Sequence, residues 1–381
     1  MRKSTATIKP KANRGRSVAV IGGGIGGLTS AIAFARSGAQ VTLHEKAAEL
    51  REYGAGLQIT PNGRRALDAL GIDVGPIGLR AEAVIPMDGL SGRKLATLRV
   101  GGQKPGYLFV HRGDLLHLLG KQAGEAGVEI KLSSGIDFAR NLAGLQVAAD
   151  GLHSSHRSRI NKDPLPRFSN QVAWRAVIEA EDEPVARIWM LPGAHIVTYP
   201  MTARRMNVVA IREQDEWVSE GWSVKGRPEN LQAAFAHVCN DLRDILEKVR
   251  EVHLWDLFLR PVARSWFQQD TVLLGDAAHP TLPFLAQGAN LAVEDAYVLA
   301  RCCNDTEDQT IALERYQALR RPRVTRAIEA ANANARNYHH RGLNRVAAHA
   351  GIFLLGALAP NLLINRLSWL YDHDVTAPPP D

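Results

Sequence analysis

The chain has 381 residues, of which 45% are hydrophobic and 22% are charged, and this composition excludes an intrinsically disordered protein. The length predicts two packed units, or one large α/β domain that carries an insertion. The three cysteines are too few for a disulfide framework and fit a reducing compartment.

The formal net charge of +7 first suggests a nucleic acid or an anionic membrane as partner. Its distribution argues against both, because six basic residues fall in residues 1–17 and eight arginines fall in residues 315–345. The rest of the chain is slightly acidic. No segment reaches the roughly 20 apolar residues of a membrane-spanning helix. We therefore expect no nucleic-acid partner, no transmembrane segment and a cytoplasmic location.

The first predicted elements form a βαβ unit. Residues 17–21 are a short apolar run that ends in glycines, which predicts a buried parallel strand. Residues 25–37 have apolar residues at helical spacing, and Gly38 ends that helix. Residues 40–44 then predict a second strand, so the chain opens as a βαβ motif.

The turn between this strand and helix has the spacing G-x-G-x-x-G. Gly22 permits the tight turn, Gly24 lets the backbone approach a pyrophosphate, and Gly27 lets the helix pack closely on the strand. The helix N-terminus favours phosphate through its partial positive charge. Glu45 closes the second strand and is placed to accept a hydrogen bond from a ribose 2′-hydroxyl, which disfavours a 2′-phosphate. The unit predicts an adenosine-containing dinucleotide and leaves FAD and NAD both open.

The later elements are a helix, a hairpin, a helix and a strand, then a β-rich region, a helical region, a strand and two long helices. They cover residues 61–70, 83–99, 113–126, 128–132, 170–212, 229–249, 271–275, 287–303 and 308–340. Strand segments of the nucleotide unit fall near residues 20, 147 and 273, with the β-rich region between them. We therefore expect a discontinuous nucleotide domain that carries an inserted sheet.

Two further segments narrow the choice between FAD and NAD. Residues 149–157 read ADGLHSSHR, and residues 274–280 read LGDAAHP, followed by QGAN at 287–290. With the opening unit, they resemble the class A (single-component) FAD-dependent aromatic monooxygenases of the p-hydroxybenzoate hydroxylase fold. The narrower salicylate and 3-hydroxybenzoate hydroxylase branch is resembled by QVAWRA (171–176), HIVTYP (195–200), PFLAQGAN (283–290), RRPRVTR (320–326) and WLYDHDVT (369–376).

The resemblance implies an oxidoreductase with FAD as cofactor and NADH or NADPH as a transient co-substrate. With O₂, such a protein hydroxylates a small phenolic acid of the salicylate or hydroxybenzoate type through a flavin C4a-hydroperoxide. Two alternatives stay open: a hydroxylase of a larger aromatic such as a quinone precursor, and a flavin-binding protein with impaired turnover. A homodimer is compatible with the resemblance.

The fold expected from pattern and resemblance is α/β, with a discontinuous Rossmann-like FAD-binding domain, an inserted mainly antiparallel β-sheet substrate domain and C-terminal helices. The expected boundaries are 1–16 for a disordered basic leader, 17–75, 100–165 and 265–305 for the FAD-binding domain, 76–99 and 166–264 for the substrate domain, and 306–381 for the helical region. Only residues 133–148 stand where the family has a longer hairpin, which raises the question of weakened FAD binding.

The expected cofactor contacts combine the glycine turn with positions taken from the resemblance. They are Gly22, Gly24, Gly27, Glu45, Gly56, Arg112, Asp150, Asp276, Gly288, Ala289 and Asn290. Asp276 would face the ribityl hydroxyls or phosphate, although it could be an ordinary helix N-cap. The segment from Gly288 would open a helix whose N–H groups stabilise negative charge on a reduced flavin. Arg112 could instead be solvated, and Asp150 could form a local salt bridge.

The catalytic candidates are His195, Tyr199 and Pro283. His195 and Tyr199 lie four residues apart in a predicted strand, so they share one face. His195 has a suitable pKa for general base catalysis of phenol ionisation, although it could be a hydrogen-bonded sheet histidine. Pro283 would present its carbonyl beside the substrate, by resemblance. His279 is expected to be structural, and no residue cluster has metal-ligand spacing.

Overall fold

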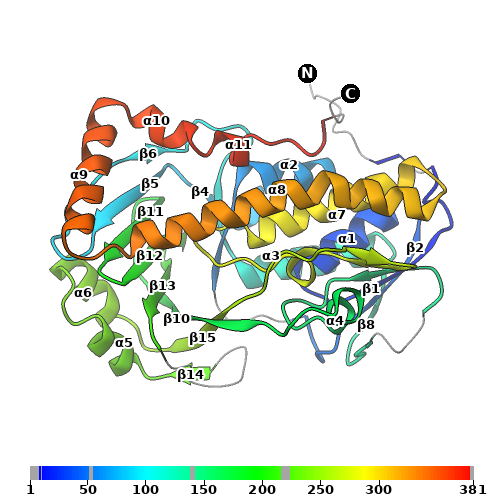
Figure 1. The fold of residues 1–381 in the computed structure, drawn as a ribbon, viewed down its shortest axis with the longest axis horizontal. Coiled ribbons are helices and arrows are strands. Elements are labelled where there is room, and N and C mark those ends of the chain that lie inside the picture. Colours follow the sequence, from blue (N-terminus) through cyan, green and yellow to red (C-terminus); the bar gives the residue numbers. More distant parts are fainter. Residues whose placement is uncertain (1–7, 10, 51–54, 138–141, 216–223, 378–381) are drawn as a thin grey trace.

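The computed structural model describes residues 8–9, 11–50, 55–137, 142–215 and 224–377, and its strands form two large sheets and one small sheet (Figure 1). The first large sheet has six strands in the order β16–β17–β9–β1–β2–β8. These are β1 (Ser17–Ile21), β2 (Gln40–His44), β8 (Glu129–Lys131), β9 (Leu145–Ala148), β16 (Phe267–Gln268) and β17 (Thr271–Leu273). All neighbours pair in parallel except β16 with β17. The predicted nucleotide sheet is therefore present.

Helices and a small sheet pack around the parallel sheet. Their bounds are α1 (Ile25–Arg36), α2 (Pro61–Ala69), α3 (Arg112–Glu125), α4 (Ser155–Asn161), α7 (Gly288–Asp305), and the 3-10 turns η1 (Gly75–Ile77) and η2 (Gly275–Ala277). The small sheet has the order β3–β7–β4, with β3 (Gly56–Ile59), β4 (Gly78–Arg80) and β7 (Leu108–His111). Apolar residues of β1 and α1, such as Val20, Leu28 and Ile32, are fully buried in the core between these layers.

The second large sheet has eight strands in the order β14–β15–β10–β13–β12–β11–β5–β6. They are β5 (Ala83–Asp88), β6 (Leu98–Arg99), β10 (Arg167–Glu179), β11 (Val185–Leu191), β12 (Ala194–Thr202), β13 (Arg205–Glu213), β14 (Val224–Gly226) and β15 (Val252–Leu259). Its pairs are antiparallel except β11 with β5. The predicted hairpin of residues 83–99 and the β-rich region therefore belong to one mainly antiparallel sheet.

The two faces of this sheet meet different partners. Along β12, Ala194 and Ile196 join a core with α5 (Pro228–Ala234) and α6 (Asn240–Glu247). Tyr199 instead joins a core with residues of β4 and β7. Successive strand residues face opposite sides, so the small sheet and the two helices cover opposite faces of the large one. The single helical region expected at 229–249 is thus two short helices.

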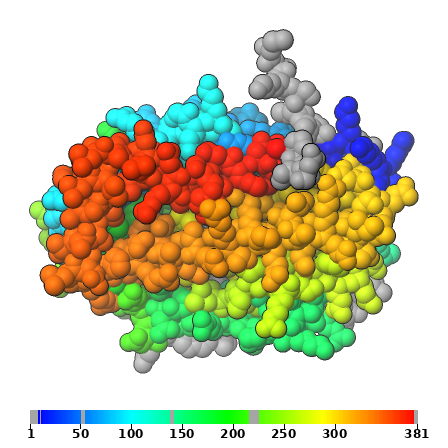
Figure 2. All heavy atoms as spheres, turned by 45° about the horizontal axis from the view of Figure 1, so that its top comes forward, coloured from blue at the N-terminus to red at the C-terminus, as the bar shows by residue number. Residues whose placement is uncertain are grey.

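Up to residue 377, where the described part of the chain ends, four C-terminal helices complete the fold: α8 (Gln309–Tyr338), α9 (Gly342–Leu358), α10 (Pro360–Asn365) and α11 (Ser368–Tyr371). The long helix α8 crosses the molecule from α7 to the neighbourhood of β12 (Figure 1). Figure 2 shows α8 to α11, in orange and red, spread over one face of the molecule. Among the described residues, no helix combines the length and apolar character that crossing a membrane requires. The division into domains at the expected boundaries is our proposal.

The structure differs from the expected disordered leader at residues 11–16. The side-chain amide of Asn13 is fully buried and donates to Ser37 Oγ at 2.8 Å and to the Ala300 carbonyl at 2.9 Å. The backbone N–H of Lys11 donates to Asn304 Oδ1 at 2.9 Å. A few polar anchors order this basic segment, which composition alone does not reveal. Residues 1–7 and 10 lie outside the described residues.

Candidate functional site

The glycine turn has the geometry that close helix–strand packing requires. Gly22 has φ +108°, and a Cβ on Gly27 would lie 1.9 Å from the Gly22 carbonyl oxygen. Neither position accepts a larger residue without moving the backbone. Gly24 is the N-cap of α1, and a Cβ there would meet no atom within 4 Å. Open space therefore lies at the helix N-terminus, where a pyrophosphate is expected.

Glu45 lies against this turn. Its Oε2 accepts a hydrogen bond from the Gly23 N–H at 2.6 Å, and its Oε1 accepts one from the Ala47 N–H at 2.8 Å. The carboxylate is thus held at the end of β2 beside the open space at Gly24. This position fits the expected ribose contact, and both oxygens retain capacity to accept another hydrogen bond.

Two distant segments bring opposite charges together near the turn after β17. Asp276 is solvent-exposed, yet the surrounding protein desolvates its carboxyl group and raises its pKa, while the charges of His279 and Arg112 act in the opposite direction. Arg112 is the first residue of α3, and its backbone N–H donates to the Ala55 carbonyl at 2.9 Å. The carboxyl group of Asp276 is reachable from solvent, is partly desolvated by neighbouring protein and is attracted by the positive charge of Arg112. Such an acid is suited to bind hydroxyl groups of a ligand.

The N-terminus of α7 is a third part of the site. Gly288 and Ala289 open the helix, and no side chain caps it. The preceding Ala286 has φ +53°, a conformation that non-glycine residues rarely adopt and that is often found at functional sites. Asn290 is fully buried: its Nδ2 donates to the Gln58 carbonyl at 2.9 Å. The Asn290 side chain therefore joins α7 to β3, and its backbone is what remains for a cofactor.

A buried ionic network holds these segments in place. Arg320 of α8 donates to Glu294 and Asp295 of α7 at 2.7 Å each. Asp295 also accepts from the ring of His279 and from the Gly275 N–H, 3.3 Å away. Glu294 accepts from Asn62 of α2 at 2.6 Å. The network fixes the turn that carries Asp276, and His279 has the structural role expected for it.

Two further expected cofactor contacts are Gly56, at the start of β3, and Asp150, which follows β9. The Gly56 N–H donates to Asn207 Oδ1 at 2.7 Å, and a Cβ on Gly56 would lie 2.7 Å from Asn207 and Tyr199. Asp150 Oδ2 lies 2.8 Å from His156 Nδ1, which is the local pair left open as an alternative. Its Oδ1 is buried and has no hydrogen-bond partner among the described residues. That oxygen is available to a ligand group.

His195 and Tyr199 lie on the same face of β12, as predicted from their spacing. His195 is 1% exposed, and its ring centroid lies 5.3 Å from that of Phe284 and 5.2 Å from that of Tyr338. Burial lowers the pKa of His195 well below its usual value, and the nearby His339 acts in the same direction. Pro283 directly precedes Phe284, so the proline expected beside the substrate lies one residue from a ring that contacts His195.

Tyr199 belongs to a group of aromatic rings between the small sheet and the large sheet. Its ring centroid lies 5.0 Å from that of Phe109, and Tyr107 donates a hydrogen bond to Gln58. Burial raises the pKa of Tyr199, whereas the positive charge of Arg175 and a hydrogen bond with Gln58 act in the opposite direction. The charge of Arg175 in β10 therefore acts on Tyr199, and sequence reasoning had not singled out Arg175.

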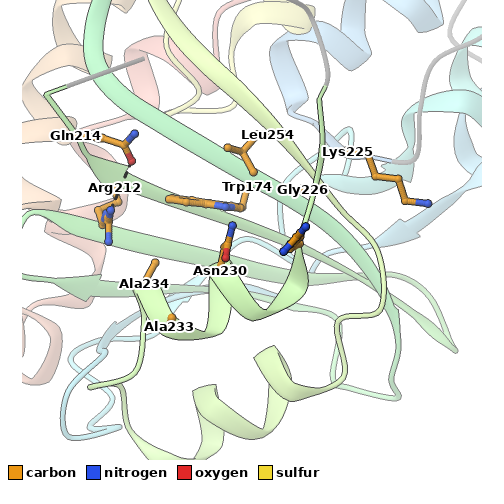
Figure 3. Close-up of a pocket in the computed structure, with 10 residues that line it drawn as sticks. Trp174, Arg212, Gln214, Lys225, Gly226, Asn230, Ala233, Ala234 and Leu254 are labelled. Atoms are coloured by element: carbon orange, nitrogen blue, oxygen red, sulfur yellow. Dashed lines mark hydrogen bonds between the residues drawn. The ribbon is translucent and has the colours of Figure 1, made fainter. Parts of the chain in front are cut away.

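A separate hollow lies elsewhere on the molecule. It has a volume of about 630 Å³ and is lined by residues of β10, β13, β14, β15 and α5, including Trp174, Arg212 and Asn230 (Figure 3). Trp174 packs in the core with α5 and α6, so this hollow lies on the opposite face of the sheet from Tyr199. Because it is separated from the glycine turn and from His195, we do not assign it to the site. Among the described residues, no three potential metal ligands cluster.

The residues present fit FAD. The open N-termini of α1 and α7 suit its pyrophosphate and its electron-rich ring edge. Acceptors for hydroxyl groups are supplied by the exposed Asp276, by Glu45 and by the unpartnered Asp150 Oδ1. These three residues follow the strands β17, β2 and β9 of the parallel sheet. The eight-stranded sheet lies next to Gly56 and contributes the aromatic side chain of Tyr199.

Comparisons with known proteins agree with this geometry. A family model described as FAD binding domain matches residues 120–331, and a pyridine nucleotide-disulphide oxidoreductase model matches residues 17–75. A 3-amino-4-hydroxybenzoate 2-monooxygenase of Streptomyces platensis is 34% identical over 354 residues, covering 84% of this chain and 88% of the relative. A 3-hydroxybenzoate 6-hydroxylase of Aquipseudomonas alcaligenes is 29% identical over 385 residues, covering 93% and 97%. A solved salicylate hydroxylase substrate complex has a TM-score of 0.79 at 21% identity, covering 96% of this chain and 99% of that one.

Proposed function

Because the chain belongs to the class A FAD-dependent aromatic monooxygenases, we propose that it hydroxylates a small aromatic acid bearing a phenolic hydroxyl group, at the expense of NADH or NADPH and O₂. The observation that carries this proposal is the face of β12 and β10, where His195 and Tyr199 meet the field of Arg175. Relatives that act on hydroxybenzoates support the same substrate class.

Each of the three side chains matches one part of such a substrate. The neutral ring of His195 can accept the phenolic proton, which increases electron density in the aromatic ring. The guanidinium of Arg175 can hold the carboxylate through charge-assisted hydrogen bonds. Tyr199 and Phe109 offer ring contacts, and Pro283 offers a carbonyl oxygen to the substrate hydroxyl group. FAD supplies the reducing and oxygen-activating chemistry when bound.

Purified protein tests the reaction directly. We expect a yellow protein that retains FAD, oxidises NADH or NADPH faster when a hydroxybenzoate or an aminohydroxybenzoate is present, and forms an identified hydroxylated product. Hydrogen peroxide is measured in parallel, since oxidation without product indicates an unsuitable ring. A panel that includes a quinone precursor separates the larger-aromatic alternative, and product from no compound would refute the proposal.

Arg175 provides a sharper test of the substrate class. We expect Arg175→Met to weaken binding of the phenolic acid by about 10- to 150-fold, which corresponds to the 1.5–3 kcal/mol of a hydrogen bond to a charged group. Binding of the matching carboxamide should change little. Arg212→Met is the control, because Arg212 also lies over a tryptophan ring but lines the hollow on the opposite face. Equal losses for acid and amide would assign Arg175 a structural role instead.

A further inference from the structure

A chain of hydrogen-bonded side chains runs from His195 toward solvent. The Nδ1 atom of His195 lies 2.8 Å from Nε2 of His339, and Nδ1 of His339 lies 3.1 Å from Oε1 of Glu213. The other carboxylate oxygen of Glu213 accepts a hydrogen bond from Arg341 at 2.6 Å. The Glu213 side chain is 41% exposed, whereas the His195 residue is buried. A buried ring is thus connected to the protein surface.

The acidic end of this chain fixes where its protons lie. An ionised carboxylate only accepts hydrogen bonds, so Nδ1 of His339 must be the donor to Glu213. A neutral His339 then has an unprotonated Nε2, and His195 must donate to it from Nδ1. This assignment leaves Nε2 of a neutral His195 without a proton, which is the state that a general base requires.

The surroundings favour these protonation states. Hydrogen bonds from Arg341 and His339 lower the pKa of Glu213, although partial burial acts in the opposite direction. Burial lowers the pKa of His339 as well as that of His195, so both rings are neutral at neutral pH. Of the other groups that face His195, Phe284 does not titrate, and burial raises the pKa of Tyr338 to about 12. Tyr199, on the same strand, also has a raised pKa.

Backbone hydrogen bonds hold His195, His339 and Glu213 in position relative to one another. Gly193, in the turn between β11 and β12, donates from its N–H to the His339 carbonyl at 3.1 Å and accepts from the Glu213 N–H at 3.0 Å. His195 pairs with Ile211 across β12 and β13, so Glu213 lies two residues further along on the same face. His339 is the C-cap of α8, which places it at the end of the long helix beside this turn.

We propose that Glu213 and His339 are positioning residues that set the tautomer of His195 and carry the phenolic proton of the substrate from it to solvent. This inference rests on the proposed function. The phenolic O–H bond breaks as an N–H bond forms at Nε2 of His195, whose Nδ1 proton passes to Nε2 of His339. The Nδ1 proton of His339 passes to Glu213, and from there to water. One proton leaves the substrate and one reaches solvent, so the step consumes no oxidant or reductant.

Substitutions at position 339 test proton transfer. Both His339→Leu and His339→Gln should retain FAD and substrate binding but form hydroxylated product at least about tenfold more slowly near pH 7. This loss is smaller than the roughly 10²–10⁴-fold contribution of a general base, because His195 itself is kept. The loss should shrink as the pH approaches about 10, where a phenol ionises without help. His349→Leu is the control, because His349 is also buried and lies 3.3 Å from the Asp88 carboxylate in another part of the fold. Unchanged rates in either His339 variant, or a loss independent of pH, would overturn the proton-transfer role.

A second measurement needs neither cofactor nor substrate. Nitrogen-15 spectra of histidine-labelled protein, with His195 assigned by its loss in His195→Gln, should show the proton on Nδ1 of His195. In His339→Leu the ring should gain the tautomer protonated at Nε2, whereas His339→Gln should keep an acceptor for Nδ1. A wild-type His195 protonated at Nε2 would overturn the inference even if hydroxylation is found. The predicted tautomer together with no hydroxylated product would instead refute the proposed function and leave the chain of hydrogen bonds intact.

Discussion

Gly24 and Gly27 belong to one motif, but their separate substitution by alanine should affect different properties. Gly27→Ala should lower stability, and Gly24→Ala should weaken FAD binding. A Cβ on Gly27 would lie 1.9 Å from the Gly22 carbonyl oxygen, so the two segments must move apart by at least about 1 Å to avoid a contact under 3.0 Å. Gly22 cannot yield easily, because its N–H donates to the His44 carbonyl at 2.8 Å and a Cβ at its own position would meet Ala149. Overpacking of this kind costs about 1–3 kcal/mol of unfolding free energy or more.

Gly24→Ala should behave in the opposite way. The residue has φ −73° and ψ −179°, which alanine adopts freely, and the new methyl group meets no protein atom within 4 Å. The loss of a good N-cap residue costs under about 1 kcal/mol, and the reduced entropy of the unfolded chain offsets part of it. The methyl group would, however, occupy the space expected for the pyrophosphate.

The assays are urea unfolding of the protein without flavin and FAD titration followed by fluorescence. We expect Gly27→Ala to lose stability before any cofactor is added. Gly24→Ala should unfold within about 1 kcal/mol of wild type but bind FAD at least about tenfold more weakly, since overpacking against the ligand costs about 1–3 kcal/mol. Wild-type FAD affinity in Gly24→Ala, or wild-type stability in Gly27→Ala, would refute the assignment of these two roles.

Three further predictions concern the charged groups of α7, α8 and the turn after β17. Arg320→Met should lower the unfolding free energy by about 3–5 kcal/mol, because it removes the positive charge that Glu294 and Asp295 share in the core. Arg315→Met, on the exposed side of the same helix, should cost under about 1 kcal/mol in urea unfolding. Although burial acts in the opposite direction, Arg320, Arg323 and Asn62 lower the pKa of Glu294 from 4.5 to about 2, so its contribution is present above pH 4.5 and is lost as the pH falls toward 2. Glu294→Gln should therefore show a flatter dependence of stability on pH in that window, by on the order of 3 kcal/mol, and equal slopes for variant and wild type would contradict this. Asp276→Ala should fold normally, since the side chain is exposed, but retain FAD about tenfold less well after gel filtration, in line with the loss of a hydrogen bond to a charged group; unchanged retention would remove Asp276 from the FAD site.

The local parts of the fold and site could be predicted from the sequence. The βαβ opening, the glycine turn and the long C-terminal helices follow from short-range patterns of apolar residues and glycines. The common face of His195 and Tyr199 follows from strand periodicity alone. The Rossmann-like sheet and the inserted antiparallel sheet needed only the positions of the strand signals along the chain.

The parts that were missed depend on contacts between distant segments. His195 and His339 are 144 residues apart, and Glu213 and His339 are 126 apart, so no local pattern joins them. Arg175 resembles any other charged residue of a strand until the opposite face is assigned to helices α5 and α6. Asn13 was missed because a short polar segment is ordered by its partners and not by its own composition.

The strand order of the parallel sheet has a consequence for synthesis of the chain. β1 is made first, but the sheet is closed on one side by β17, which ends at Leu273, and β9 has no neighbour there until that strand is made. A ribosome that adds about 5–20 residues per second needs roughly 6–25 seconds to add the 125 residues from the end of β9 at Ala148 to the end of β17 at Leu273. During that time the unpaired edge of β9 is open to wrong partners, and the strands β10 to β15 of the antiparallel sheet are all made before β17. The unit that begins translation is thus the last to become able to hold FAD, and nascent chains stopped before residue 271 should depend on chaperones for solubility.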